Sequence, residues 1–396
     1  MKKLLILTLC LSVLSASAQK GLKTLRGYVS SKNTTEALKE AGRLSEDSLW
    51  RNDPLVYDYA FKAQSLDYER INEKFYLKQS PDTAALFKAV SGLFEWARKC
   101  DMAERYQQAI TKRKIKFRKA HSETLNTQFS NMLAGVRYFY RHKQPQEVSR
   151  LASQIIDCKR DSLFWQHFKP QVTETQLIHA AYLHHRAEFA QEHYAECLKY
   201  VDIALKDSAL RPNVLWATAK SYAVLGDTVS YLHYLQTGLN ENPLDERFFV
   251  PLVRYMAKHG ENERALDFVR KHRAHDYTNT TFAEAELMCL FNLGRWDETL
   301  AKAKAIPKEG DFTHYYIATS LCKKAEGITL PTRRNTREYR QLLKQKKDYY
   351  TEARGHMEKF RENRPKAERM WAPWLYDIYL NLNLGKEFEE IQKHVK

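Results

Sequence analysis

Leu225-Gly226-Asp227, His259-Gly260-Glu261 and Leu293-Gly294-Arg295 are three stretches in which a glycine recurs at one interval. Gly226 and Gly260 are 34 residues apart, and so are Gly260 and Gly294. Glycine is favoured at a sharp turn because it has no Cβ. Self-similarity at this period is typical of repeated helix-turn-helix units. The spacing therefore predicts successive helical hairpins, with the three glycines at equivalent corners.

Residues 212–245 show one full unit. Leu215, Ala219 and Tyr222 fall on one face of a first helix, and Leu235 and Leu239 line a second. Pro243 follows, where a helix must stop. This pattern resembles the tetratricopeptide repeat (TPR), which has a large apolar residue, a small residue and Tyr in its first helix, Gly at the turn and Pro at the end. Looser packing is expected where the unit departs from the family, at Thr218, Tyr231 and Gly238.

The same phase extends forward through 246–279 and 280–313, and backward through 178–211, which lacks the turn glycine. Four contiguous repeats are enough to bury a continuous core. The resemblance implies an all-α fold, a right-handed α-solenoid of TPR-like helix-turn-helix repeats with an irregular helical N-terminal part. A helical bundle with accidental glycines is the weaker alternative. The predicted regions are 1–18 (signal peptide), 19–127 (irregular helices), 128–177 (a TPR-like unit and spacer), 178–313 (four repeats), 314–365 (an interrupted unit with a basic insertion at 328–340) and 366–396 (capping helices).

The first residues have the pattern of a secretory signal. Met1-Lys2-Lys3 is basic, residues 4–14 are apolar, and Ala16-Ser17-Ala18 supplies small residues for cleavage before Gln19. Leu9 precedes Cys10, which does not fit a lipoprotein signal. No later stretch is apolar enough to cross a bilayer. We therefore expect an exported, periplasmic chain without a transmembrane segment; association with the outer membrane remains open.

Composition fits a large helical protein, because only 13 glycines and 11 prolines occur in 396 residues. The formal net charge is +16, or +14 without Lys2 and Lys3. The five later cysteines are scattered and have no C-x-x-C spacing, so buried small hydrophobes are expected. A pairing such as Cys100–Cys158 is the open alternative in an oxidising compartment.

Aspartates mark several expected helix starts. Asp53-Pro54 and Asp82 are each expected to begin a helix in the N-terminal part, and Asp101 is expected to begin another. The densest basic run of the chain follows at residues 112–119, and a second lies at 333–347. Export argues against nucleic acid as the partner of these runs, and no aromatic-rich RNA-binding motif accompanies them. Anionic envelope polymers or lipids suit them better, with a plain solvated surface as the simplest interpretation.

The TPR resemblance also implies a binding surface. In that family the first helices of successive repeats line a concave groove, and matching positions here form a row of cations beside two aromatic rings. Such a row suits an extended peptide, a carboxylate-bearing chain or a glycan; a solvated helix face is the equal alternative. The expected partner-binding residues are His179, Tyr182, Arg186, Asn213, Trp216, Lys220, Arg247, Val250 and Arg254, and the same positions of the next repeat are Thr281, Glu284 and Met288.

Nothing in the sequence indicates catalysis or a cofactor. His185, Glu188 and Glu192 could share a helix face, but the H-E-x-x-H zinc spacing is absent, so no metal site is predicted. No P-loop, G-x-S-x-G or dinucleotide-binding glycine pattern occurs, and the chain is not expected to be an enzyme.

Five Asp-Ser/Thr triplets resemble an O-glycan acceptor of exported bacterial proteins. The alternative is that Asp-Ser and Asp-Thr simply start helices. The acceptor residues would be Ser48, Thr83, Ser162, Ser208 and Thr228.

The resemblance is to exported TPR proteins of Gram-negative bacteria. It implies a periplasmic protein–protein interaction scaffold of the cell envelope, with a protein or peptide partner in the groove and an anionic envelope polymer as a second candidate ligand. The alternative function is a glycan- or polysaccharide-binding helical-repeat protein of the envelope.

Overall fold

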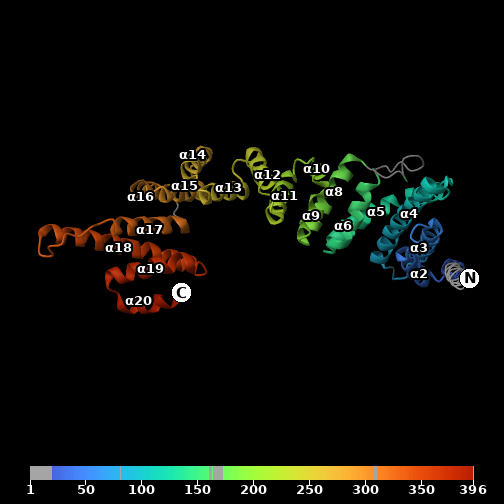
Figure 1. Ribbon diagram of the computed structural model, residues 1–396, viewed down its shortest axis with the longest axis horizontal. Helices are drawn as coiled ribbons and strands as arrows, with labels where there is room; N and C mark the ends of the chain where they lie inside the picture. Colours follow the sequence, from blue (N-terminus) through green and yellow to red (C-terminus); the bar gives the residue numbers. More distant parts are fainter. Residues whose placement is uncertain (1–19, 81, 160–162, 164–172, 307–309, 396) are drawn as a thin grey trace, which may run out of the picture. The chain divides into compact units, whose positions relative to one another are not determined.

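The computed structural model describes residues 20–80, 82–159, 163, 173–306 and 310–395 (Figure 1). The predicted signal segment 1–18 and Ser162 lie outside these ranges. All regular secondary structure in the described ranges is helical, with no strand, so the predicted all-α fold of TPR-like hairpins is confirmed. The chain divides into two compact units, Met1–Tyr231 and Leu232–Lys396, here called unit 1 and unit 2, and the division falls within α12.

Unit 1 consists of paired helices and short connections. Residues 20–30 are helical and precede the others. The following elements are α2 (Thr34–Glu46), α3 (Pro54–Tyr76), α4 (Thr83–Thr111), α5 (Arg118–Arg141), α6 (Pro145–Asp157), α8 (Glu174–Ala190), α9 (Tyr194–Cys197), η1 (Leu198–Tyr200), α10 (Val201–Ala204), α11 (Arg211–Leu225) and the first turn of α12 (Thr228–Glu241).

Unit 2 continues in the same way from the rest of α12. Its other elements are α13 (Glu246–Lys258), α14 (Asn262–Arg273), α15 (Thr280–Asn292), α16 (Trp296–Lys304), α17 (Asp311–Glu326), α18 (Arg337–Asn363), α19 (Glu368–Leu382), α20 (Gly385–Ile391) and η2 (Gln392–His394).

The predicted basic insertion is shorter than expected at its end. Thr336 caps α18, accepting a hydrogen bond from the Tyr339 N–H at 3.0 Å, so residues 337–340 are helical.

The three predicted glycine corners share one backbone geometry. φ is 81° at Gly226, 76° at Gly260 and 72° at Gly294, in the left-handed region. The residue after each glycine donates its N–H to the carbonyl five residues back, at 3.0 Å in all three cases. The glycine N–H itself bonds the carbonyl three residues back. These two bonds form the Schellman motif, which satisfies the last carbonyls of a helix. The prediction of equivalent corners is confirmed.

Five further corners have the same hydrogen bonds without glycine. Glu192, at φ 61°, holds the turn position of the repeat that lacks glycine, and the His193 N–H bonds the Glu188 carbonyl at 3.0 Å. The other four corner residues are Lys32, Lys78, Lys143 and Asn383, with φ between 52° and 59°. The N-terminal part is therefore built of helical hairpins too, and it is irregular only in the lengths of its helices.

Two of the predicted helix starts are confirmed and one is wrong. The Asp53 carboxylate accepts from the Leu55 N–H at 2.9 Å, and Asp82 accepts from Ala85 at 2.9 Å. Asp101 does not begin a helix, because α4 continues through it from Thr83 to Thr111. Its buried carboxylate instead accepts a hydrogen bond from Arg118 at 2.6 Å, which fixes the start of α5 against α4.

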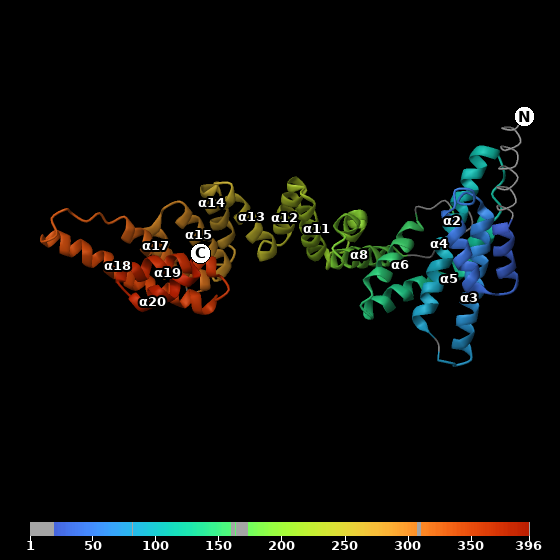
Figure 2. The same cartoon turned by 60° about the horizontal axis from the view of Figure 1, so that its bottom comes forward.

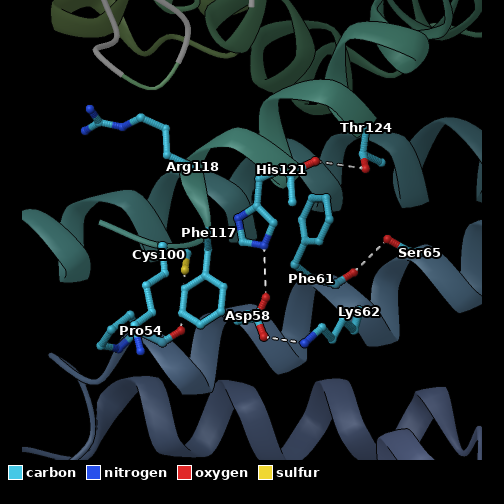
Figure 3. A network of polar contacts seen from close by, with 12 residues as sticks. Pro54, Asp58, Phe61, Lys62, Ser65, Cys100, Phe117, Arg118, His121 and Thr124 are labelled. Atoms are coloured by element: carbon cyan, nitrogen blue, oxygen red, sulfur yellow. Dashed lines mark hydrogen bonds and ion pairs between the residues drawn. The ribbon is translucent and has the colours of Figure 1, made fainter. Parts of the chain in front are cut away.

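A buried polar network joins α3 and α5 of unit 1 (Figure 3). Asp58 of α3 points toward His121 of α5, with Oδ1 3.1 Å from Nε2, and Lys62 donates to the other carboxylate oxygen at 2.6 Å. Burial alone would raise the pKa of Asp58, but the hydrogen bonds from His121 and Lys62 outweigh it and lower that pKa. Phe61 packs on the His121 ring, with centroids 4.0 Å apart. The network therefore holds α3 and α5 in one packing arrangement.

The departures from the TPR pattern have local causes. Thr218 is fully buried, and its hydroxyl lies 3.1 Å from His185 Nε2, so it provides a partner for a buried ring. At Gly238, an added Cβ would lie 2.3 Å from the Phe248 ring. The expectation of looser packing is therefore wrong at these two positions, because one supplies a hydrogen bond and the other admits an aromatic ring.

The five cysteines of the described residues are buried, and none of them forms a disulfide. No disulfide joins Cys100 to Cys158, and the expectation of buried small hydrophobes is confirmed. Burial raises the pKa of Cys197 to about 11, because the thiolate is poorly solvated there. These thiols are therefore packing residues and not exposed nucleophiles.

Candidate functional site

The predicted groove residues of unit 1 form two aromatic–cation pairs. Tyr182 and Arg186 lie one turn apart on α8, and the Arg186 guanidinium donates to the Tyr182 hydroxyl at 3.3 Å. The same guanidinium lies 5.5 Å from the Tyr140 ring centroid of α5. Tyr140 and Arg186 both line a hollow of about 510 Å³. Arg186 is thus held between two tyrosines at the edge of this hollow.

The second pair is on α11. Lys220 Nζ lies 6.0 Å from the centroid of the Trp216 ring, and Trp216 packs on Phe189 with centroids 5.7 Å apart. Trp216 is half-buried, while Lys220 and Asn213 are exposed. His179 is exposed on α8 and lines a separate hollow of about 280 Å³ with Arg137 and Asp207.

In unit 2, Arg247 is already engaged on its own helix. Its guanidinium pairs with Asp245 at 2.7 Å, and its backbone N–H donates to the same carboxylate, which caps α13. Burial would raise the pKa of Asp245, but the bonds from Arg247 lower it on balance. Asp245 therefore stabilises the start of α13, and the Arg247 guanidinium pairs with this capping carboxylate.

The other predicted groove residues of unit 2 come together in one pocket of about 230 Å³. Val250 and Arg254 reach it from α13, and Thr281, Glu284 and Met288 from α15. These are equivalent positions of two successive repeats, as the periodicity predicts. The repeat phase did not predict the remaining lining residues, which are Phe249, Val253, Ala285, Phe312, Tyr316 and Arg364.

Glu284 has a structural task in this pocket. Its carboxylate accepts a hydrogen bond from the Thr313 N–H at 3.0 Å, in the first turn of α17. Gly310 precedes that helix, and a Cβ there would lie 2.2 Å from Glu284 Oε1. Burial raises the pKa of Glu284, which the N–H groups of Thr313 and Phe312 only partly oppose. Glu284 therefore caps α17 from α15, in the preceding repeat. A capping side chain normally belongs to the residue just before the helix that it caps.

Arg254 is the cation of this pocket that has no acidic partner among the described residues. Arg364, by contrast, pairs with Asp311 at 2.6 Å. Arg254 and Tyr316 both line the pocket. Burial raises the pKa of Tyr316, and the positive charge of Arg254 acts in the opposite direction. Val250, Val253 and Met288 make the nearby wall apolar. The pocket can thus take an anionic group with an apolar flank.

The histidine-rich part of α8 is arranged for packing. His185 bonds Thr218, and burial lowers its pKa to about 4. Glu188 accepts a hydrogen bond from Ser149 and lies 2.9 Å from His193 Nδ1. The carboxylate stands between the serine and the histidine, so this set does not place an imidazole base on the hydroxyl. Among the described residues, no three His, Cys, Asp or Glu side chains are grouped to hold a metal ion.

The acceptor-like triplets lie at turns and helix starts wherever the structure describes them. Asp47 and Asp207 each accept an N–H two residues on, and Asp82 and Asp227 accept one three residues on. Ser48, Ser208 and Thr228 are exposed and Thr83 is half-buried. Capping and turn roles thus account for the aspartates, and glycosylation of the hydroxyls stays a prediction.

No helix in the described ranges is both long and apolar enough to cross a membrane.

Comparison with known proteins gives distant structural likenesses only. No family model and no curated protein matches the sequence. Among solved structures, a tetratricopeptide repeat protein from Parabacteroides merdae shares 11% identity, with 73% of this chain and 93% of that chain covered and a TM-score of 0.29. Yeast Tom70 shares 11% identity over 96% of this chain and 91% of its own, with a TM-score of 0.35. The Cut9–Hcn1 hetero-tetramer of the APC/C shares 11% over 94% and 73%, with a TM-score of 0.36. The repeated left-handed corners of the chain itself, and not these likenesses, identify its fold as TPR-like.

Proposed function

We propose that this protein is a periplasmic interaction scaffold of the cell envelope that binds a partner protein through the Arg254 pocket. One observation carries the proposal: groove positions of two successive repeats meet in a pocket whose Arg254 guanidinium has no acidic partner among the described residues. A bound carboxylate would complete that charge. The signal pattern at residues 1–18 supports export, and the repeat architecture supports binding over catalysis.

The pocket favours a particular partner chemistry. A cation beside Val250, Val253 and Met288 suits an extended segment in which Asp, Glu or a terminal carboxylate neighbours an apolar residue. An acidic peptide without the apolar neighbour should bind less well, because the apolar wall would remain hydrated.

The test is cross-linked capture from envelope extract with the chain from residue 19 onward. Arg254→Glu should lose the main partner, because the reversed charge repels a carboxylate. Lys258→Glu is the matched control, since Lys258 is an exposed cation one turn further along α13 and outside the pocket. Equal capture by all three proteins would reject the Arg254 pocket as the binding site.

A second function, glycan binding, is favoured by α11. Trp216 is half-buried against Phe189 and flanked by Lys220, and aromatic faces with a nearby cation also suit sugars and acidic polysaccharides. A glycan array that showed binding lost in Trp216→Ala but kept in Arg254→Glu would select this function over the first.

A further inference from the structure

The end of α4 carries an exposed apolar stripe. Met102, Tyr106 and Ile110 are 61%, 50% and 62% exposed and follow one another at intervals of four residues. Side chains at this interval lie on one face of a helix. Figure 2 shows the cyan end of α4 reaching past α2 and α3. This stripe is therefore an apolar helix face that the described part of unit 1 leaves uncovered.

A cluster of cations follows the stripe directly. Lys112, Arg113, Lys114 and Lys116 are exposed, and their side-chain cations form no ion pair with an acidic side chain of the described residues. Lys112 ends α4 in a left-handed conformation, with φ 59°, so the chain turns there and keeps these charges beside the last turns of the helix. We call residues 102–116 the α4 tip.

Buried carboxylates hold the α4 tip in place. Glu104 is 6% exposed and accepts the Lys116 N–H at 2.5 Å and the Phe117 N–H at 3.2 Å. Asp101 is 2% exposed and bonds Arg118 at 2.6 Å. The cationic segment is thus fixed to the helix that bears the stripe. Binding therefore costs little further conformational entropy in this segment.

We infer that the α4 tip docks on an anionic phospholipid surface. Cations next to a bilayer gain from its negative surface potential, and a helix face with aromatic and aliphatic side chains gains from burial at the headgroup boundary. A soluble polyanion would satisfy the cations but would leave Met102, Tyr106 and Ile110 in water. The chain would therefore rest on a membrane although none of its described helices crosses one. This inference is independent of the Arg254 pocket.

Vesicle sedimentation tests the inference with the chain from residue 19 onward, so that the apolar signal segment does not contribute. Vesicles of phosphatidylcholine with one third phosphatidylglycerol should bind the protein at low salt, and pure phosphatidylcholine should not. Arg113→Glu/Lys114→Glu should lower the partition coefficient on the order of 30-fold or more, since each cation near such a surface contributes roughly a fivefold gain. The matched control is Arg333→Glu/Arg334→Glu, which removes two exposed cations of the other basic run.

The apolar stripe separates a bilayer from a soluble polyanion. Met102→Ser/Ile110→Ser should weaken vesicle binding about tenfold or more and leave heparin binding unchanged. A fluorophore attached at Ile110→Cys should shift to the blue with the anionic vesicles, whereas one at Tyr277→Cys, an exposed site of unit 2, should not. No binding of the wild-type chain to anionic vesicles, or equal vesicle binding by the Met102→Ser/Ile110→Ser variant, would overturn the inference. Loss of vesicle binding would leave capture through Arg254 unaffected, so the two proposals fail separately.

Discussion

The corners at Gly226, Gly260 and Gly294 have the same hydrogen bonds as those at Lys32, Lys78 and Lys143, but a different residue makes the turn. A left-handed conformation costs a residue with a Cβ about 1–2 kcal/mol, whereas glycine adopts it freely. The lysine corners therefore persist because the packed helices on either side hold them. The difference teaches that the hairpin, and not the glycine, is the repeated unit of this chain.

The largest effect should come from removing all three glycines. The triple variant Gly226→Ala/Gly260→Ala/Gly294→Ala should unfold about 3 kcal/mol more easily, because nothing lies within 4 Å of an added Cβ and only the backbone strain remains. Urea denaturation followed by circular dichroism measures this loss. Gly355→Ala is the control, since Gly355 lies in α18 with open space around it and without a left-handed φ. That variant should gain up to about 1 kcal/mol. A triple variant as stable as wild type would mean that corners with and without glycine do not differ in strain.

Acidification should weaken the contact between the repeat whose corner residue is Glu192 and the next repeat, whose corner residue is Gly226. His185 bonds Thr218 of the next repeat, and burial lowers its pKa from the ordinary value of 6.5 to about 4. The unfolded chain binds this proton more tightly than the folded chain, so the stability from neutral His185 is complete above about pH 6.5 and is lost as the pH falls toward 4. We expect stability about 2 kcal/mol lower at pH 5 than at pH 7. Denaturation of His185→Gln should show a much flatter pH dependence; an equally steep one would assign the proton to another group.

The smallest effect should come from adding a glycine. Lys143→Gly relieves the left-handed strain at its corner but gives the unfolded chain more freedom, so a net gain of about 0.5 kcal/mol is expected. Lys344→Gly, within α18, should instead lose about 1 kcal/mol. Calorimetry on both variants measures the contrast, and similar losses in both would show that the Lys143 corner is not strained.

The sequence predicted the glycine corners because two conditions held together. A residue type that signals the left-handed conformation stood at each corner, and the helices together with their connections kept the period at 34 residues. Neither holds earlier in the chain. Lysine gives no signal for a left-handed turn, and α3, α4 and α5 are 23, 29 and 24 residues long, so no short period survives. The hairpins there could not be recognised from spacing.

The residues of the candidate site could likewise be predicted only where the repeat period of 34 residues holds. The repeat phase placed Val250, Arg254 and Met288 on one face without their contacts being known. Arg364 was missed because the long connection between α17 and α18 breaks the phase before it. Phe312 and Tyr316 lie on α17, which is not a first helix of the four predicted repeats. The role of Glu284 was not predictable either, since it depends on α17 starting beside α15, which no local pattern encodes.

The lysine corners have a practical consequence for chemistry on this protein. Lys32, Lys78 and Lys143 are exposed amines at the ends of successive hairpins, and their side chains take no part in the backbone bonds that define the turn. Amine-specific cross-linkers attached there would report distances between hairpins along unit 1 without disturbing its core. The substitutions that hide these repeats from spacing analysis thus supply sites for measuring how the hairpins stack.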